Sequence, residues 1–382
     1  ERVAFALGHS YVSHLSKIFM DLMQIYKLYS ENISLAIKNG SYNNSILKAT
    51  KTVRREILNL IATFIKLSED PDMIVNDFLP TLSQLIEDYT NNVESARDPE
   101  VLSLFAALIE KMGDKMNPHI PEILNYLFEP TLSMISSNYT SFMDTRRNFF
   151  SLIKNIVNFS LEGLFTATED NFKTCMNSII WAIKHYQIEL SDIGLETMDN
   201  LLAKVVSNSD IANIFFQNFY MTIMEETLFV LTDSLHKSGF YKQAVIIMKL
   251  VQIVENQIFM GSLSDSYDNN KEFVIEYFSE TLVKLFPNTN KMQIQTFVLN
   301  MFNNCGVNKE FVNTMRDFLI ALKEFAGDED DLYKQERDVA LKEASDREDL
   351  KKQSIPGLLK QQAMDNFNGV AKLEEEDENE ED

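Results

Sequence analysis

Glycine and proline are scarce in this sequence. Its 382 residues include 11 glycines and 8 prolines. A sheet protein of this length would need many tight turns, and tight turns favour these two residue types. The scarcity therefore argues against a turn-rich β fold and favours a chain built mainly from helices.

Cysteine is nearly absent, and so are long uncharged stretches. Cys175 and Cys305 are the two cysteines, which excludes a disulfide framework and indicates a reducing compartment. A membrane-spanning helix needs about 18 or more consecutive apolar residues. The richest candidate, IFFQNFYMTIMEETLFVL, carries Glu225 and Glu226 in its middle, so no membrane insertion is expected.

Positive charge is also in short supply. The 35 Lys and Arg residues stand against 57 Asp and Glu residues, for a net charge of −22. Direct binding to nucleic acid is not expected, because the phosphates would repel such a chain. The charge instead suits a partner with a basic surface, or serves solubility alone.

Motifs for catalysis and ligand binding are missing as well. The sequence has no phosphate-binding glycine loop and no G-x-S-x-G elbow, and its five histidines lie far apart. The segment DEDDLYKQE resembles a calcium loop, but Tyr333 stands where the turn glycine belongs. We therefore expect no enzyme, no catalytic residue, no cofactor and no metal site. Because the sequence begins with Glu1 and shows no signal peptide, we also expect a piece of a longer protein.

The sequence does contain a succession of amphipathic helices. In NVESARDPEVLSLFAALIEKMG, Asp98 and Pro99 suit a helix start, apolar residues recur at three- and four-residue spacing, and Gly113 can end the helix. The same reading predicts helices over 10–38, 46–67, 72–89, 99–112, 119–137, 143–160, 169–187, 191–206, 211–236, 241–256, 270–286, 290–303, 308–325 and 329–352.

A weak internal repeat groups these helices into pairs. FLPTLSQLIEDY (78–89) aligns with FEPTLSMISSNY (128–139) at a spacing of 50 residues. Asx-Pro pairs that can begin a helix recur at Asp70, Asp98 and Asn117. Two helices in about 40 to 50 residues are typical of HEAT repeats, whose pairs bury their apolar faces only by stacking. The predicted fold class is all-α, an α-α superhelix of HEAT repeats.

Three arginines at related positions form a candidate ladder. Arg97 falls on Arg147 at the same spacing, and Arg55 opens the second helix of the preceding pair. The ladder would supply inter-repeat ion-pair partners, or alternatively a row of guanidinium groups for ligand carboxylates.

The single tryptophan marks a candidate partner surface. In TEDNFKTCMNSIIWAIKHY an apolar stripe runs from Phe172 to Tyr186, and helical geometry places Trp181 opposite it, beside Lys184 and His185. Trp181 would either pack against a neighbouring repeat or serve as an exposed anchor flanked by cations.

The composition changes near the end of the chain, from amphipathic to mostly polar, and this change divides the sequence into three predicted regions. Residues 1–326 would form about seven helical pairs, and residues 327–353 a long helix that is polar on most sides. Residues 354–382 would be a flexible tail, first apolar and then acidic. The acidic end would serve solubility, or would fold back on the solenoid or on a basic partner.

Several segments resemble one family. HLSKIFMDLMQIYKLYSENIS, TVRREILNLI, NSIIWAIKH, RDFLIALKEFAGDE and SIPGLL look like the C-terminal part of the Crm-type exportins, within the importin-β or karyopherin family. The resemblance implies the C-terminal arch of a ring-shaped HEAT-repeat receptor that shuttles between nucleus and cytoplasm. It also implies cooperative binding of leucine-rich-signal cargo with Ran-GTP, and contacts with nucleoporins and Ran-binding accessory proteins.

The resemblance further implies an autoinhibitory element near the C-terminus and an export-signal groove before residue 1. The positions carried over are Leu332, Val339, Leu350, Ile355, Pro356, Gly357, Leu358 and Leu359. Two other classes stay open, a static HEAT scaffold for a multi-subunit complex and an importin-like receptor for basic cargo.

Overall fold

The computed structural model describes residue 6 and residues 11–40, 45–137, 141–287 and 289–322. The chain divides into two compact units, residues 1–319 and residues 320–382. Almost all described residues belong to the first unit.

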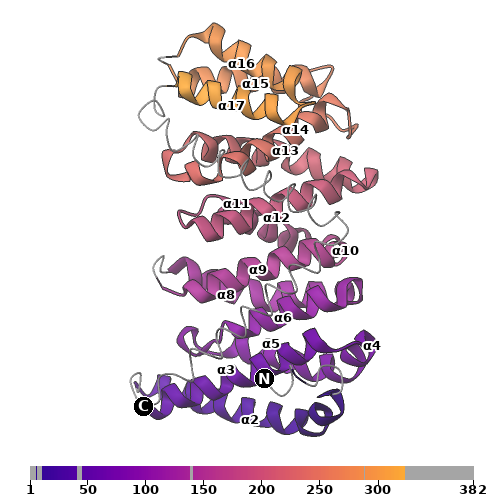
Figure 1. Cartoon of the computed structure of the whole chain (residues 1–382), viewed down its shortest axis with the longest axis vertical. Helices are drawn as coiled ribbons and strands as arrows, with labels where there is room; N and C mark the ends of the chain where they lie inside the picture. The colour runs from indigo at the N-terminus through magenta and orange to yellow at the C-terminus, as the bar shows by residue number, and fades with distance from the viewer. Residues whose placement is uncertain (1–5, 7–10, 41–44, 138–140, 288, 323–382) are drawn as a thin grey trace, which may run out of the picture. The chain divides into compact units, whose positions relative to one another are not determined.

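All regular elements of the described residues are helices (Figure 1). The longer α-helices are α2 (Val12–Lys38), α3 (Ser45–Leu67), α5 (Leu79–Asn91), α6 (Glu100–Met112), α8 (Glu129–Ser137), α9 (Met143–Phe159), α11 (Glu169–Ile183), α12 (Ile188–Val206), α13 (Ser209–Thr232), α14 (Phe240–Glu255), α15 (Asn270–Leu285), α16 (Lys291–Asn304) and α17 (Asn308–Ala321). Short elements join them: α4 (Pro71–Met73), α7 (Ile120–Ile123) and α10 (Leu161–Phe165), the π-helical turns η2 (Ile74–Phe78) and η5 (Leu124–Phe128), and the 3-10 turns η3 (Glu94–Ala96), η4 (Gly113–His119) and η6 (Ser234–Gly239).

Consecutive helices pack as pairs, and the pairs stack in two layers. Within pairs, α2 packs on α3, α5 on α6, α8 on α9, α11 on α12, α13 on α14 and α15 on α16. The second helices form one layer, in the order α3, α6, α9, α12, α14 and α16, while the first helices form the other. This arrangement confirms the predicted HEAT-repeat solenoid.

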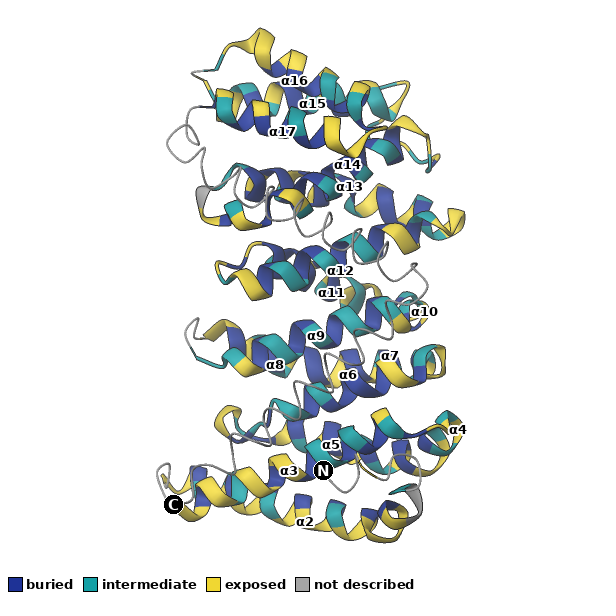
Figure 2. Ribbon diagram, viewed as in Figure 1, coloured by how far each residue is buried: buried dark blue, intermediate teal, exposed yellow. Residues whose placement is uncertain are grey.

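The core of this unit is continuous along the stack rather than gathered in one centre. Figure 2 shows buried residues running through the helices, with more exposed residues on α2 and α16 at the two ends of the unit. A helix in the middle of such a stack is covered by its pair partner and by both neighbours. Accordingly, α6 buries nine of its residues.

Two of the three predicted Asx-Pro helix starts are confirmed. Asp70 Oδ1 accepts from the Met73 N–H at 3.1 Å, and Asp98 Oδ1 accepts from the Glu100 N–H at 3.2 Å. The third is wrong, because Asn117 lies inside the 3-10 turn η4. Its Oδ1 instead accepts from the backbone N–H of Gly163 at 3.2 Å, which joins two repeats.

The repeated prolines have a structural counterpart that the sequence did not predict. Pro80 and Pro130 each lie just after a π-helical turn. A proline lacks the N–H that would bond the carbonyl four residues earlier, and its ring clashes with that carbonyl. The wider π turn accommodates the ring. The carbonyl four residues before Pro130, that of Tyr126, accepts from the Thr90 hydroxyl of the preceding repeat at 2.9 Å.

The predicted apolar stripe of the tryptophan helix is correct in its middle and wrong at its end. Cys175, Ile179 and Ile183 are buried, but Tyr186 is 54% exposed. The physical reason is that α11 ends at Ile183, so helical spacing no longer places the later residue on the same face. Among the described residues, no helix is long and apolar enough to span a membrane.

Candidate functional site

Trp181 lies at the junction between two helical pairs. Its half-buried ring meets the ring of Phe150 on α9 edge-on, with centroids 5.6 Å apart. Lys184 pairs with Glu226 Oε2 of α13 at 2.6 Å, and its ammonium lies 5.2 Å from the ring centre of Phe229. Trp181 and Lys184 thus bridge α11 to its two neighbours, and their role as a partner surface stays a prediction.

His185 is buried beside them and cannot serve as an exposed cation. Its Nδ1 accepts from the Gln187 N–H at 3.0 Å, which requires the neutral ring. Burial, with the nearby charges of Arg146 and His236, lowers the pKa of His185 to about 4. The imidazole is therefore uncharged at neutral pH.

The three ladder arginines each reach a neighbouring repeat, but by different contacts. Arg55 Nε lies 3.6 Å from Asp98 Oδ1, and Arg147 Nε lies 2.6 Å from Glu189 Oε1. Arg97 donates instead to backbone carbonyls, to Tyr89 at 3.0 Å and to Pro130 at 2.9 Å. A ligand carboxylate would have to displace these contacts.

Sequence reasoning missed the two fully buried arginines, which directly precede Arg55 and Arg147. Arg54 donates to Ser30 Oγ at 3.1 Å and to the Ala96 carbonyl at 2.7 Å, and lies 3.4 Å from Asp98 Oδ2. Arg146 caps carbonyls of the helix and loop before α9. The helical spacing could have revealed both. Residues three and four positions after each arginine, Ile57 and Leu58 in one case and Phe149 and Phe150 in the other, are core residues on the same helix face.

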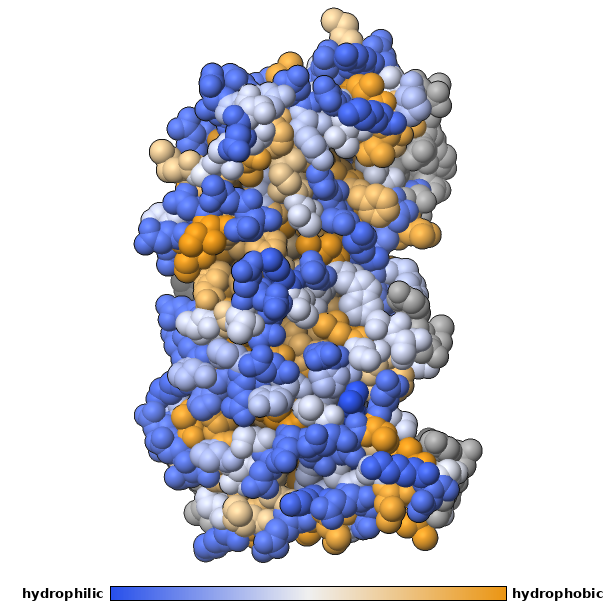
Figure 3. Space-filling model, turned by 180° about the vertical axis from the view of Figure 1, so that it is seen from behind, coloured by the Kyte–Doolittle hydropathy of each residue, from blue (hydrophilic) through white to orange (hydrophobic). Residues whose placement is uncertain are grey.

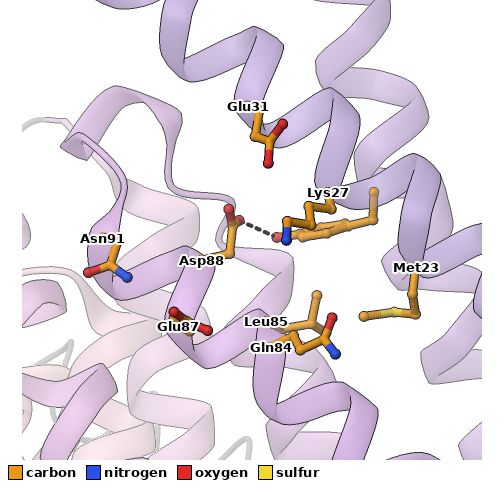
Figure 4. A pocket seen from close by; sticks show the side chains of 9 residues that line it. Met23, Lys27, Glu31, Gln84, Leu85, Glu87, Asp88 and Asn91 are labelled. Atoms are coloured by element: carbon orange, nitrogen blue, oxygen red, sulfur yellow. Dashed lines mark hydrogen bonds between the residues drawn. The ribbon is translucent and has the colours of Figure 1, made fainter.

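A polar pocket of about 420 Å³ opens between α2 and α5 (Figure 4). At its inner edge Asp88 accepts from Tyr26 at 3.0 Å, from Ser30 at 2.7 Å and from Asn92 at 2.9 Å. Burial, and then the charge of Asp88, raise the pKa of the Tyr26 hydroxyl well above its usual value. Since both carboxylate oxygens are occupied, this network serves to join the helices of successive repeats.

An apolar groove of about 510 Å³ lies between α10 and α11 on one side and α13 on the other. It is lined by Phe165, Ala167, Glu169, Phe172, Lys173, Ile211, Ile214, Phe215, Asn218 and Phe219. The ring of Phe172 lies 5.6 Å from that of Phe165 and 5.5 Å from that of Phe219. Ile214 is 68% exposed at the groove, and the Lys173–Glu169 ion pair borders it.

This groove combines exposed aliphatic surface with edges and faces of aromatic rings. Such a lining accepts a hydrophobic or aromatic side chain of a partner. On the face drawn in Figure 3, hydrophilic side chains lie between several hydrophobic patches. The groove escaped sequence reasoning because α11 and α13 meet only in the stacked fold.

The remaining predicted site residues lie outside the described part of the chain. They are the positions predicted to form an autoinhibitory element: Leu332, Val339, Leu350, Ile355, Pro356, Leu358 and Leu359. Within the described ranges, no three His, Cys, Asp or Glu side chains cluster as a metal site would require.

The stacked helical pairs define a helical-repeat protein of the HEAT class. The family model described as CRM1 C terminal matches residues 14–327. The chain is 37% identical to Exportin-1 of Dictyostelium discoideum over 367 residues, 94% of this chain and 34% of that protein. It is 36% identical to Protein EXPORTIN 1B of Arabidopsis thaliana over 372 residues, with the same shares, and 32% identical to Exportin-1 of Drosophila melanogaster over 360 residues, 93% of this chain and 34% of that protein.

The chain therefore belongs to the CRM1 C-terminal family, which confirms the resemblance to the C-terminal part of an exportin. It spans about a third of the length of the curated relatives it matches.

Proposed function

We propose that this chain is the C-terminal region of a nuclear export receptor that carries cargo with leucine-rich signals through nuclear pores together with Ran-GTP. The observation that carries the proposal is the family match over residues 14–327, which coincides with the HEAT-repeat stack. On this proposal the protein is a transport receptor and not an enzyme, and it shuttles between nucleus and cytoplasm.

Cooperative loading follows from linkage. If cargo and Ran-GTP each bind one curvature of the solenoid better than another, each raises the affinity of the other by the same factor. A coupling of about 1–3 kcal/mol is typical of such systems. A stack held by nearest-neighbour contacts can change curvature through small shifts at many junctions.

The test of this proposal uses a complete receptor in which the chain replaces the aligned third of a relative. A fluorescent leucine-rich peptide is titrated against it with Ran-GTP and with Ran-GDP. Binding should tighten about tenfold with Ran-GTP, as the coupling above requires. Binding that ignores the nucleotide would instead indicate a static scaffold, and a preference for basic signals would indicate an importin-like receptor.

Within this proposal, the groove between α11 and α13 receives hydrophobic side chains of nucleoporins during passage through the pore. Its support is the exposed Ile214 and the aromatic cluster around Phe172. Hydrophobic burial there is worth about 1.5–3 kcal/mol per side chain. Contacts of this size are weak enough for rapid release.

The groove is tested with Ile214→Asp, which places a charge in the apolar lining. Met292→Asp is the matched control, because Met292 is also largely exposed but lies outside the groove. Binding of nucleoporin hydrophobic segments should weaken about tenfold in the first variant and not in the second. Equal binding by the two variants would contradict the groove assignment.

The last part of the proposal concerns residues 327–382. As the family resemblance implies, the helix containing Leu332 and Leu350, with the segment from Ile355 to Leu359, would favour the cargo-free form. Deleting residues 327–382 from the complete receptor should then raise cargo affinity at limiting Ran-GTP. An unchanged cargo affinity would contradict autoinhibition by these residues, but it would not contradict the proposed export function.

A further inference from the structure

Three consecutive second-layer helices carry charged side chains at a spacing of seven residues. Along the stack the signs alternate, since α9 presents cations, α12 presents anions and α14 presents cations. The residues are Arg147 and Lys154 on α9, Glu189, Asp192, Glu196 and Asp199 on α12, and Lys242 and Lys249 on α14. We call these eight residues the charge zipper.

The anions of α12 form ion pairs with both neighbouring helices, α9 and α14. Toward α9, the distances are 2.6 Å from Arg147 Nε to Glu189 Oε1 and 2.6 Å from Lys154 Nζ to Glu196 Oε2. These two contacts lie seven residues apart on both helices. Because a spacing of seven is close to two helical turns, equal spacing on parallel neighbours keeps successive pairs in register.

Toward α14 the contacts continue from the same anions. Lys242 Nζ lies 3.0 Å from Glu196 Oε1 and 3.2 Å from Asp192 Oδ1, and Lys249 Nζ lies 2.5 Å from Asp199 Oδ1. Glu196 thus binds a lysine from each neighbouring helix. The hydrogen bond from Lys154 is the main cause that lowers the pKa of Glu196.

The preceding junction in the same layer is held by neutral groups. Asn148 Nδ2 donates to the Pro99 carbonyl at 3.0 Å, and Asn155 Nδ2 donates to the Ala106 carbonyl at 2.9 Å. These contacts also repeat after seven residues, so α6 joins α9 in the same register as α9 joins α12. The two junctions thus share the seven-residue spacing and differ in the charge of the groups that join them.

We propose that the charge zipper is a salt-responsive brace that fixes the packing of α9, α12 and α14 and allows this part of the solenoid to loosen when its ion pairs are screened. The zipper side chains are between 29% and 57% exposed, so dissolved ions reach them. Individual exposed pairs are weak, but a network that shares Glu196 responds at two junctions together. The α6/α9 junction, which is joined by hydrogen bonds between neutral groups, should respond less.

Hydrogen exchange on the whole chain tests this brace at about 0.01 M and about 1 M salt, where the Debye length falls from about 30 Å to about 3 Å. Exchange in α12 and α14 should accelerate about threefold or more relative to α6 at high salt, because local opening controls exchange there. An equal change in α6, or none in α12 and α14, would overturn the proposal.

The variant Glu196→Gln separates the brace from general salt effects. It removes the shared anion with little change in shape, so α12 and α14 should exchange faster at low salt and respond less to added salt. The control Glu110→Gln removes an exposed acid on α6 outside the zipper. Identical exchange patterns in the two variants would contradict the brace.

A charge exchange tests the same pairs with their signs reversed. In the quadruple variant Lys154→Glu, Asp192→Asn, Glu196→Lys, Lys242→Glu the central cation faces an anion on each side, and no carboxylate at position 192 repels the new anion on α14. The slow exchange and the salt response should return. Failure of the quadruple variant to regain either one, when it retains the helicity of the parent chain, would show that Glu196 acts through something other than these pairs.

Discussion

Arg54 and Arg55 are neighbours in the sequence, yet their charges have opposite environments. The Arg54 side chain is 2% exposed and the Arg55 side chain 47%, while both approach Asp98. A buried ion pair needs further hydrogen bonds to offset desolvation, and Arg54 obtains them from Ser30 and the Ala96 carbonyl. Removing Arg54 would leave the buried Asp98 without its nearest cation.

This contrast predicts the effect of two alanine substitutions on stability. Arg54→Ala should lower the free energy of unfolding by about 3–5 kcal/mol, since it breaks a buried pair from one side. Arg55→Ala should lower it by about 1 kcal/mol or less. Chemical denaturation of the chain measures both, and equal losses would contradict the assignment of Arg54 as the buried structural partner.

His185 predicts a pH dependence of stability. Its pKa is about 4 in the folded chain and about 6.5 when unfolded. The unfolded state therefore takes up the proton first, so stability is constant above about pH 6.5 and falls as the pH drops toward 4. Between pH 7 and pH 5 the loss should be about 2 kcal/mol, measured by denaturation at each pH.

His185→Asn is the variant that isolates this effect. An asparagine oxygen can still accept from the Gln187 N–H, but it does not titrate. The variant should therefore lose most of the slope between pH 7 and pH 5. A slope equal to that of the parent chain would assign the acid sensitivity to other groups.

At the scale of elements, α12 crosses the end of α11 in close contact at Gly194. A Cβ on Gly194 would lie 2.6 Å from the backbone nitrogen of Ile183 and 2.8 Å from the carbonyl carbon of Ala182. Backbone atoms cannot move aside as side-chain ends can, so only glycine fits at this crossing. The close packing of α11 against α12 thus depends on the absence of a side chain at Gly194.

Gly194→Ala should therefore destabilise the chain by about 1–3 kcal/mol, although alanine is the better helix former. Gly306→Ala is the matched control, because nothing lies within 4 Å of its added Cβ. Its effect should stay within about 0.5 kcal/mol. Thermal unfolding of the two variants compares them, and a neutral or stabilising Gly194→Ala would refute the close crossing.

The sequence predicted the elements well because helical periodicity and caps are local. The apolar face of 99–112 and the stop at Gly113 agree with α6. The repeated segments that begin at Phe78 and Phe128 lead into the equivalent helices α5 and α8. Local patterns could not identify the π turns before Pro80 and Pro130. These turns relieve the clash between the proline ring and the carbonyl four residues earlier, which arises only once the helix has formed.

The candidate site was less predictable because it depends on which elements become neighbours. Phe172 was placed in a core stripe, but its ring contacts Phe219, 47 residues later, across the groove. The sequence is compatible with Trp181 either as a packing residue or as an anchor, and its contact with Phe150 arises only in the stack. Helical spacing in the sequence shows which residues share a face of a helix, but it does not show which other helix packs against that face.

At the scale of the whole molecule, the two helix layers of the described solenoid carry different surface features. The first-helix layer carries the apolar groove, while the second-helix layer carries the charge zipper. A receptor that binds partners on one layer and adjusts its curvature through the other could couple the two by linkage. This division is consistent with a transport receptor of the CRM1 family.

Export in cells tests the central claim most directly. The chain would replace the aligned third of Dictyostelium discoideum Exportin-1, and the chimera would be supplied to cells lacking their own receptor activity. A fluorescent reporter with a leucine-rich signal should leave the nucleus, while a reporter with a mutated signal should not. If the first reporter stayed nuclear although the chimera was folded and entered the nucleus, the account of this chain as part of an export receptor would be contradicted.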